Sequence, residues 1–138
     1  MENGKKMIEQ SSESYQKIIL NIRQDRDFIL VRSKYSDECF GNFFIEIKYK
    51  ETIKIGILND RSRIEIDLLL TEGLLKNRIP LAFVVEVFSL NQSESVKYVY
   101  DSSEDTYDYL IQHKDVLEAI MEKRLQKTII HKWKKKHF

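Results

Sequence analysis

Three consecutive segments of alternating residues constrain this chain more than any other feature. Between residues 43 and 70, apolar side chains occupy every second position, and short polar breaks at residues 50–51 and 59–62 contain residues that suit turns. Because successive side chains of a strand point to opposite sides, this pattern predicts an antiparallel meander with one buried face. The buried set comprises Phe43, Ile45, Ile47, Tyr49, Ile53, Ile55, Ile57, Ile64, Ile66, Leu68 and Leu70.

The segment before the meander has the spacing of a helix. Apolar residues from Tyr15 to Ile22 recur at intervals of three and four, after hydroxyl side chains between Ser11 and Ser14 that can cap a helix. Residues 28–31 are apolar and rich in β-formers, so they predict a short first strand.

After the meander the period changes again. Leu81, Val84, Val85 and Phe88 follow Pro80 with helical spacing, and proline suits a first helical position. The same stretch is rich in β-formers, so residues 80–90 remain open between helix and strand, although the spacing favours helix. Residues 95–100 fit either an irregular connection or a short edge strand.

The C-terminal third predicts helices. Ser102 and Asp105 have the spacing of a capping signal, and Asp115 can open one long helix that extends to Trp133. Its apolar stripe comprises Val116, Leu117, Ile120, Met121, Leu125, Ile129 and Trp133. The expected fold class is α+β: an N-terminal helix, an antiparallel meander of three to four strands, and C-terminal helices packed on one face. We expect a single domain over residues 1–138, with residues 1–10 frayed and residues 132–138 forming a basic tail.

Length and composition narrow the setting. A chain of 138 residues can bury a single core without staples, and no apolar run approaches the ~20 residues of a membrane span. The lone cysteine, Cys39, cannot form an internal disulfide, and no apolar signal segment follows the first lysines. These features predict a cytoplasmic protein with no membrane partner. An acidic neighbour such as Glu38 does not activate a thiol, so Cys39 is expected to be buried or unreactive.

One motif suggests an enzyme. Glu46 and Lys48 form a Glu-x-Lys pair at the end of an apolar run, and Asp37 lies nine residues upstream of Glu46. Two carboxylates can hold a divalent metal while a lysine stabilises charge, as in a metal-dependent nuclease. In restriction-type nucleases a crossover helix normally follows this strand, whereas here another alternating strand follows almost at once. A solvent-facing strand explains the same residues.

Charge is unevenly distributed between two runs. The first is acidic and contains Asp101, Glu104, Asp105 and Asp108, with Tyr107 and Tyr109 as candidate aromatic anchors for a partner. Glu65 and Asp67 form a second candidate acidic strip. The basic tail includes Trp133 among lysines, which would suit a nucleic-acid-binding adaptor, but Trp133 also falls on the apolar stripe and fits a core anchor.

The remaining chemistry-bearing residues do not assemble into a motif. His113, His131 and His137 lack partners at the spacing of a metal site. The chain contains no glycine-rich phosphate loop. The sequence therefore predicts no metal and no cofactor.

The order of parts resembles a group of small bacterial proteins. In that group, an N-terminal helix and a strand lead through an aromatic-Gly-Asn turn into a meander, and a helical half follows. The matching pieces are residues 40–42 (Phe-Gly-Asn), 60–62 (Asp-Arg-Ser), 64–68 and the Pro80-Leu81 helix start, over about residues 14–130. Ser62 stands where the group usually has glycine.

Several members of this group resemble immunity proteins of bacterial toxin systems. The resemblance implies a non-enzymatic protein that neutralises a cognate toxin by protein–protein contact, and it assigns no contacting residue. Such an inhibitor needs only a rigid surface of complementary charge. We therefore expect a toxin partner, which could be a nuclease. The alternatives are the nuclease site at Asp37, Glu46 and Lys48, and the nucleic-acid adaptor.

Overall fold

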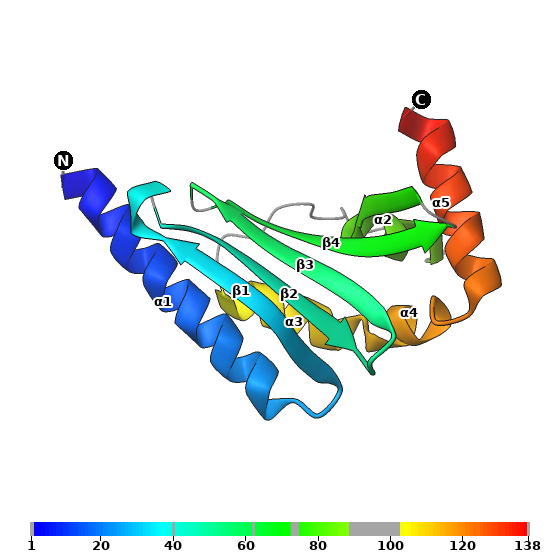
Figure 1. Ribbon diagram of the computed structural model, residues 1–138, viewed down its shortest axis with the longest axis horizontal. Helices are drawn as coiled ribbons and strands as arrows, with labels where there is room; N and C mark the ends of the chain where they lie inside the picture. Colours follow the sequence, from blue (N-terminus) through cyan, green and yellow to red (C-terminus); the bar gives the residue numbers. More distant parts are fainter. Residues whose placement is uncertain (1, 40, 62, 73–74, 89–102, 138) are drawn as a thin grey trace.

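The computed structural model describes residues 2–39, 41–61, 63–72, 75–88 and 103–137. Within these ranges, five strands form one antiparallel sheet in the order β1-β2-β3-β4-β5, and helices pack against one side of it (Figure 1). The strands are β1 (Phe28–Ser36), β2 (Asn42–Tyr49), β3 (Ile53–Asp60), β4 (Arg63–Glu72) and β5 (Leu75–Pro80). The helices are α1 (Glu2–Gln24), α2 (Leu81–Phe88), α3 (Ser103–Gln112), α4 (Lys114–Ala119) and α5 (Lys123–His137), and a 3-10 turn (Asp37–Cys39) follows β1. The α+β prediction is confirmed.

The alternating residues of the meander form the core, as predicted. All eleven apolar side chains named for the buried face are at most 2% exposed. The same cluster contains fully buried residues from every described α-helix: Ile18 and Ile22 of α1, Leu81 of α2, Leu110 of α3, Leu117 of α4 and Ile130 of α5. The helices therefore form one layer over one face of the sheet.

Two elements near the N-terminus are longer than the sequence predicts. The helix α1 begins at Glu2, so Ser11 and Ser14 lie inside it rather than at its cap. Ser11 is buried there, and its Oγ accepts a hydrogen bond from Asn59 at 3.3 Å. The first strand extends to Ser36, because β2 continues to pair with it beyond the apolar residues. The fraying of residues 1–10 stays a prediction.

The sheet has five strands rather than three to four. The additional strand, β5, pairs antiparallel with β4 from Leu75 to Pro80. Pro80 ends this strand, and α2 begins at the next residue, so the helical spacing of residues 81–88 decided correctly between helix and strand. Residues 95–100 lie outside the described part of the chain.

The long C-terminal helix is two helices in the structure. A turn at residues 120–122 separates α4 from α5, and the Gln126 side chain donates a hydrogen bond to the Ile120 carbonyl at 2.7 Å across it. The predicted anchor role of Trp133 is confirmed, since its ring packs edge-on against Phe83 with centroids 4.9 Å apart. The predicted basic tail continues α5 as far as His137.

Candidate functional site

The side of the sheet that faces away from the helices is here called the open face. No described helix packs on it. By strand alternation and register it carries seven basic and four acidic side chains among the described residues: Arg32, Lys34, Lys48, Lys54, Arg63, Lys76 and Arg78, with Glu46, Asp60, Glu65 and Asp67. Phe44, Leu58 and Leu69 lie between them, half-buried. The open face is therefore a mixed surface with an excess of positive charge.

Two carboxylates on the open face are nearly inaccessible to solvent. Glu46 and Asp67 are only 8% and 4% exposed, and they lie on opposite sides of Gly56 in one cross-strand row. Each is paired with an arginine from an outer strand. Arg32 Nη2 lies 3.2 Å from Glu46 Oε1, and Arg78 donates through Nε to Asp67. A buried carboxylate requires such a partner, so these pairs hold both arginines in place.

The pairing of Arg32 with Glu46 depends on an irregularity in β1. The register between β1 and β2 shifts between Leu30 and Arg32, so Val31 has no directly opposed partner. Without this bulge, Val31 would lie opposite Glu46. A bulge adds one residue to one strand and thereby redirects the side chains that follow it.

An aromatic ring shields the space between the two carboxylates. A Cβ added to Gly56 would lie 3.2 Å from Cε2 of Phe44 and 3.8 Å from Leu69, so both side chains lean over the glycine. The guanidinium of Arg32 lies 5.6 Å from the centre of the Phe44 ring, a cation–π distance. The centre of the open face is therefore a small, ordered cluster rather than a set of independent surface side chains.

Two hollows flank this cluster. One, of about 210 Å³, is lined on its charged rim by Arg32, Lys54, Lys76, Arg78 and Glu46, with Leu69, Thr71 and Asn77 completing it. The other, of about 270 Å³, is lined by Leu58, Asp60, Arg63 and Glu65. The first hollow, called the cationic hollow below, has four basic groups and one paired carboxylate.

The structure separates the three residues of the predicted nuclease site. Glu46 and Lys48 share the open face, but Asp37 lies beyond the end of β1. Its carboxylate is close to the hydroxyl of Tyr35, which contacts the Ile8 carbonyl of α1 at 3.2 Å on the helix side. Burial raises the pKa of Tyr35, and the hydrogen bond to Asp37 raises it further. Since Glu46 is also committed to Arg32, these groups do not converge on one ion.

Only some residues of the two predicted acidic strips are described by the structure and exposed on its surface. Asp101 lies outside the described residues, and for Glu104 and Asp105 the structure describes the helix backbone but not the side chains. Asp108 is exposed on α3, whereas the hydroxyl of Tyr107 donates to Asp25 Oδ2 at 3.0 Å. In the second strip, Glu65 is exposed. Asp67 lies on the open face, as the alternation suggested, but it is buried beside Arg78 rather than exposed.

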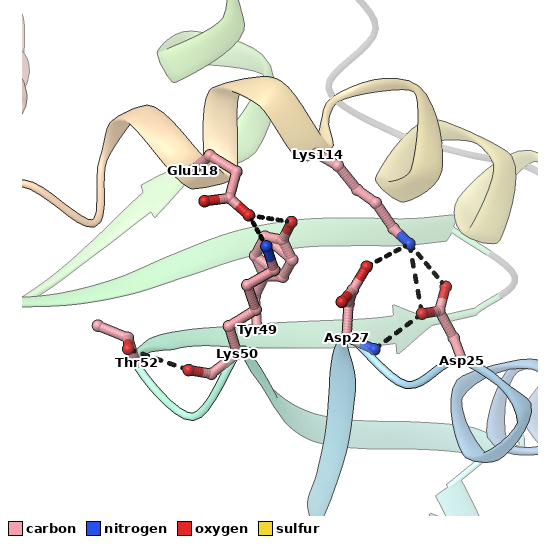
Figure 2. Close-up of polar contacts among 7 residues, drawn as sticks. All are labelled: Asp25, Asp27, Tyr49, Lys50, Thr52, Lys114 and Glu118. Carbon is pink, nitrogen blue, oxygen red and sulfur yellow. Dashed lines mark hydrogen bonds and ion pairs between the residues drawn. The ribbon is translucent and has the colours of Figure 1, made fainter.

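Tyr107 belongs to a polar network that the sequence did not reveal. Figure 2 shows Lys114, at the start of α4, reaching Asp25 and Asp27 in the connection between α1 and β1. Lys114 Nζ lies 3.1 Å from Asp25 Oδ2 and 2.9 Å from Asp27 Oδ2, and it lies 5.5 Å from the centre of the Phe28 ring. The network ties two segments that are almost ninety residues apart in sequence.

A second part of the network joins α4 to the β2–β3 turn. Glu118 accepts hydrogen bonds from the Tyr49 hydroxyl at 2.9 Å and from Lys50 (Figure 2). The turn itself has positive φ at Lys50 (49°) and Glu51 (62°), the geometry of a tight hairpin. The predicted turn at residues 50–51 is therefore confirmed, and α4 is fastened to it.

The carboxylates of the network stay ionised at neutral pH, and its tyrosine hydroxyl stays protonated. Burial alone would raise the pKa of Asp25, but hydrogen bonds from the Asp27 backbone and from Lys114 lower it overall. Hydrogen bonds from Lys50 and Tyr49 lower the pKa of Glu118. Burial, together with the hydrogen bond to Glu118, raises the pKa of Tyr49. All three pKa values move away from neutrality, so the network suits a role in holding α4 to the sheet rather than acid–base chemistry.

The histidines and the cysteine also fall short of a site. His113 lines a cavity of about 420 Å³ with Val85, Phe88 and Val116, and burial lowers its pKa. Among the described residues, no three His, Cys, Asp or Glu side chains gather closely enough to hold a metal. Cys39 is exposed, so the first alternative, a buried thiol, is wrong, and the second, an unreactive thiol, stays a prediction.

The turn motifs behind the family resemblance have a structural role. Asn42 Oδ1 accepts a hydrogen bond from the Arg61 backbone at 2.8 Å, which ties the Phe-Gly-Asn turn to the Asp-Arg-Ser turn. Gly41 has a φ of 73°, and its carbonyl accepts a hydrogen bond from the buried Asn59 at 3.2 Å. These residues join the two turns to α1, so a structural role in the fold accounts for the turn motifs.

Comparisons with known proteins add no identification. No protein-family model, curated protein or solved structure matches the chain. Within the described part of the chain, no helix is both long enough and apolar enough to cross a membrane.

Proposed function

We propose that this protein is a non-enzymatic binding protein that contacts another protein through the open face. The observation that carries the proposal is the ordered cluster at the centre of that face, where Arg32, Phe44 and Arg78 are held by two buried carboxylates. Arginine and aromatic residues are enriched at protein interfaces, and a surface that is ordered before binding loses less entropy on association.

The sheet supports such a surface well. Its strands are anchored from behind by a fully buried layer of isoleucines, so the positions of the open-face side chains are set by a rigid backbone. Half-buried apolar side chains alternate with charged ones, which is the composition of a non-obligate interface. The open face thus combines rigidity with exposed recognition groups.

The class of partner follows from the family resemblance. We propose that the protein acts in the cytoplasm as an immunity protein that neutralises a cognate bacterial toxin. An inhibitor of this kind needs no catalytic group, only a surface complementary to the toxin. The paired state of Glu46 and Asp67 supports this role over a catalytic one, because carboxylates committed to arginines are poor metal ligands and poor bases.

A tagged pull-down from the source bacterium, with mass spectrometry, tests the proposal. The wild-type protein should retain one stoichiometric partner through a moderate-salt wash. Leu58→Asp, which places a charge on the open face, should lose that partner. Leu20→Asp on α1, where the native leucine is 55% exposed, is the matched control and should retain it.

Two results would contradict the proposal. One is the absence of any partner in cells shown to express a candidate toxin. The other is equal retention by Leu58→Asp and the wild type, which would locate the contact elsewhere on the molecule.

A further inference from the structure

We infer that the partner presents an acidic protein segment to the open face, with a carboxylate group seated in the cationic hollow. This inference rests on the proposed function and specifies the chemistry of the partner. It differs from the sequence-based expectation, in which acidic residues of this chain would contact the partner.

The basic groups around the hollow are available for a ligand. Lys54 and Lys76 are exposed, and neither has an ion-pair partner among the described residues. The side chains of Arg32 and Arg78 are 70% and 47% exposed although each is anchored to a carboxylate. Four cations thus surround about 210 Å³ of space, and the one carboxylate that lines it, Glu46, is already paired with Arg32.

The two arginines are oriented for a second carboxylate. A guanidinium carries five N–H donors in a planar fork. Arg78 uses Nε for Asp67, and Arg32 uses Nη2 for Glu46, so each has further donors at its outer edge. Because the buried carboxylates fix the arginines, a ligand carboxylate would lose little side-chain entropy on binding.

A pair of opposed lysines beside the hollow also supports a bound anion. Lys48 lies directly opposite Lys54 across the β2–β3 ladder. Like charges in directly opposed positions destabilise a sheet, and nothing in the fold requires them on the open face. A local violation of this kind is expected where function sets the residue choice, and a bound anion would relieve the repulsion.

The composition of the face favours an acidic protein over a nucleic acid. Four carboxylates stand among its eleven charged groups, and Glu65 is exposed. Surfaces that bind nucleic acid are much more positively charged than protein interfaces. The apolar side chains of Leu58 and Leu69 also suit a folded protein surface better than a phosphate backbone.

A peptide-binding assay tests the inference without knowledge of the partner. A fluorescent glutamate decapeptide would be titrated with the wild-type protein at low salt, beside a single-stranded decathymidylate. The wild type should bind the peptide more tightly than the oligonucleotide. The double variant Lys54→Glu with Lys76→Glu should weaken peptide binding ~10-fold or more, because attraction becomes repulsion. The neutral variant Lys54→Gln with Lys76→Gln should show an intermediate loss and guards against misfolding of the first.

The matched control makes the same charge change elsewhere. Lys123→Glu with Lys127→Glu alters two exposed lysines of α5 and should change peptide affinity by less than ~2-fold, an effect of net charge alone. Three results would overturn the inference: no peptide binding, tighter binding of the oligonucleotide, or equal losses in the open-face and α5 variants.

The partner captured in the pull-down separates this inference from the proposed function. If the wild type and Lys54→Glu with Lys76→Glu retain that partner equally, the partner binds but the acidic-segment inference fails. If the wild type retains no partner, the proposed function fails, whatever the decapeptide does.

Discussion

The two faces of the sheet use alternate residues of the same strands, yet they hold their side chains in different ways. On the helix side, Ile45, Ile47 and Ile57 are fully buried among other apolar groups. On the open face, the most buried groups are the carboxylates of Glu46 and Asp67, and ion pairs keep them there.

This difference separates stability from recognition. Burial of apolar area is the dominant favourable term in folding, so the helix side determines whether the chain folds. Paired charges contribute little net stability, but they fix the geometry of the arginines. Variants on one face should therefore change mainly one of the two properties, and the following measurements test that separation.

The largest effect is expected on the helix side. Ile47→Ala should lower the free energy of unfolding by ~4 kcal/mol, because it removes apolar contacts and leaves a cavity. Leu69→Ala on the open face, where the side chain is half-buried, should cost ~1 kcal/mol. Urea unfolding measures both values. Equal losses would show that the open face carries as much of the core as the helix side.

Two glycines offer the next comparison. Gly41→Ala should cost ~3 kcal/mol, since its φ is 73° and its new Cβ would lie 2.8 Å from Ser11 Cβ and 3.3 Å from Ile8 Cα in α1. Gly56→Ala on the open face should cost ~1 kcal/mol, because the half-buried Phe44 ring can shift away. Thermal unfolding of the two variants would reveal the difference, and the reverse order would contradict it.

Removing the arginine of the Arg78–Asp67 ion pair should cost more stability than removing the charge of its carboxylate. Arg78→Ala leaves the nearly buried carboxylate of Asp67 without its partner and should cost ~2 kcal/mol. Asp67→Asn leaves an arginine that water can solvate and should cost under ~1 kcal/mol. Urea unfolding at neutral pH measures both. Similar losses would mean that Asp67 is more hydrated than its 4% exposure indicates.

The smallest expected effect is the pH dependence of the stability that Asp25, just after α1, contributes through its ion pair with Lys114 of α4. The pKa of Asp25 lies below its ordinary value of 3.8 in the folded state, so its contribution to stability is present above that pH. The contribution should be lost as the pH falls through the folded pKa. Unfolding free energies of the wild type and Asp25→Asn should therefore differ at neutral pH and converge in acid. A difference that stays constant down to about pH 2 would contradict this assignment.

The sequence predicted the helix-side face well because that face obeys a local rule. Alternation between residues 43 and 70 identified all eleven buried apolar side chains of the meander. The missed strand, β5, has the sequence Leu-Lys-Asn-Arg-Ile-Pro. Its polar residues and terminal proline are typical of a loop between two elements. The break between α4 and α5 contains neither glycine nor proline, so the continuous apolar stripe concealed it.

The open face was less predictable because its contacts are not local. Arg78 and Asp67 are 11 residues apart, and they meet only because β5 pairs with β4. Arg32 meets Glu46 because a bulge shifts the register of β1, a feature that alternation does not reveal. The sequence indicated that Glu46 and Asp67 would face away from the core, but not that they would be buried there.

The bulge at Val31 also has a consequence for solubility. β1 forms one edge of the sheet, and Ile29 and Val31 on it are 40% and 43% exposed. A straight, apolar edge of this kind is a template on which a strand from another molecule can add, and repeated addition leads to fibrils. The bulge interrupts the row of backbone donors and acceptors, and Arg32 and Lys34 place charge beside it. The same irregularity that aims an arginine at Glu46 thus discourages copies of the chain from joining edge to edge.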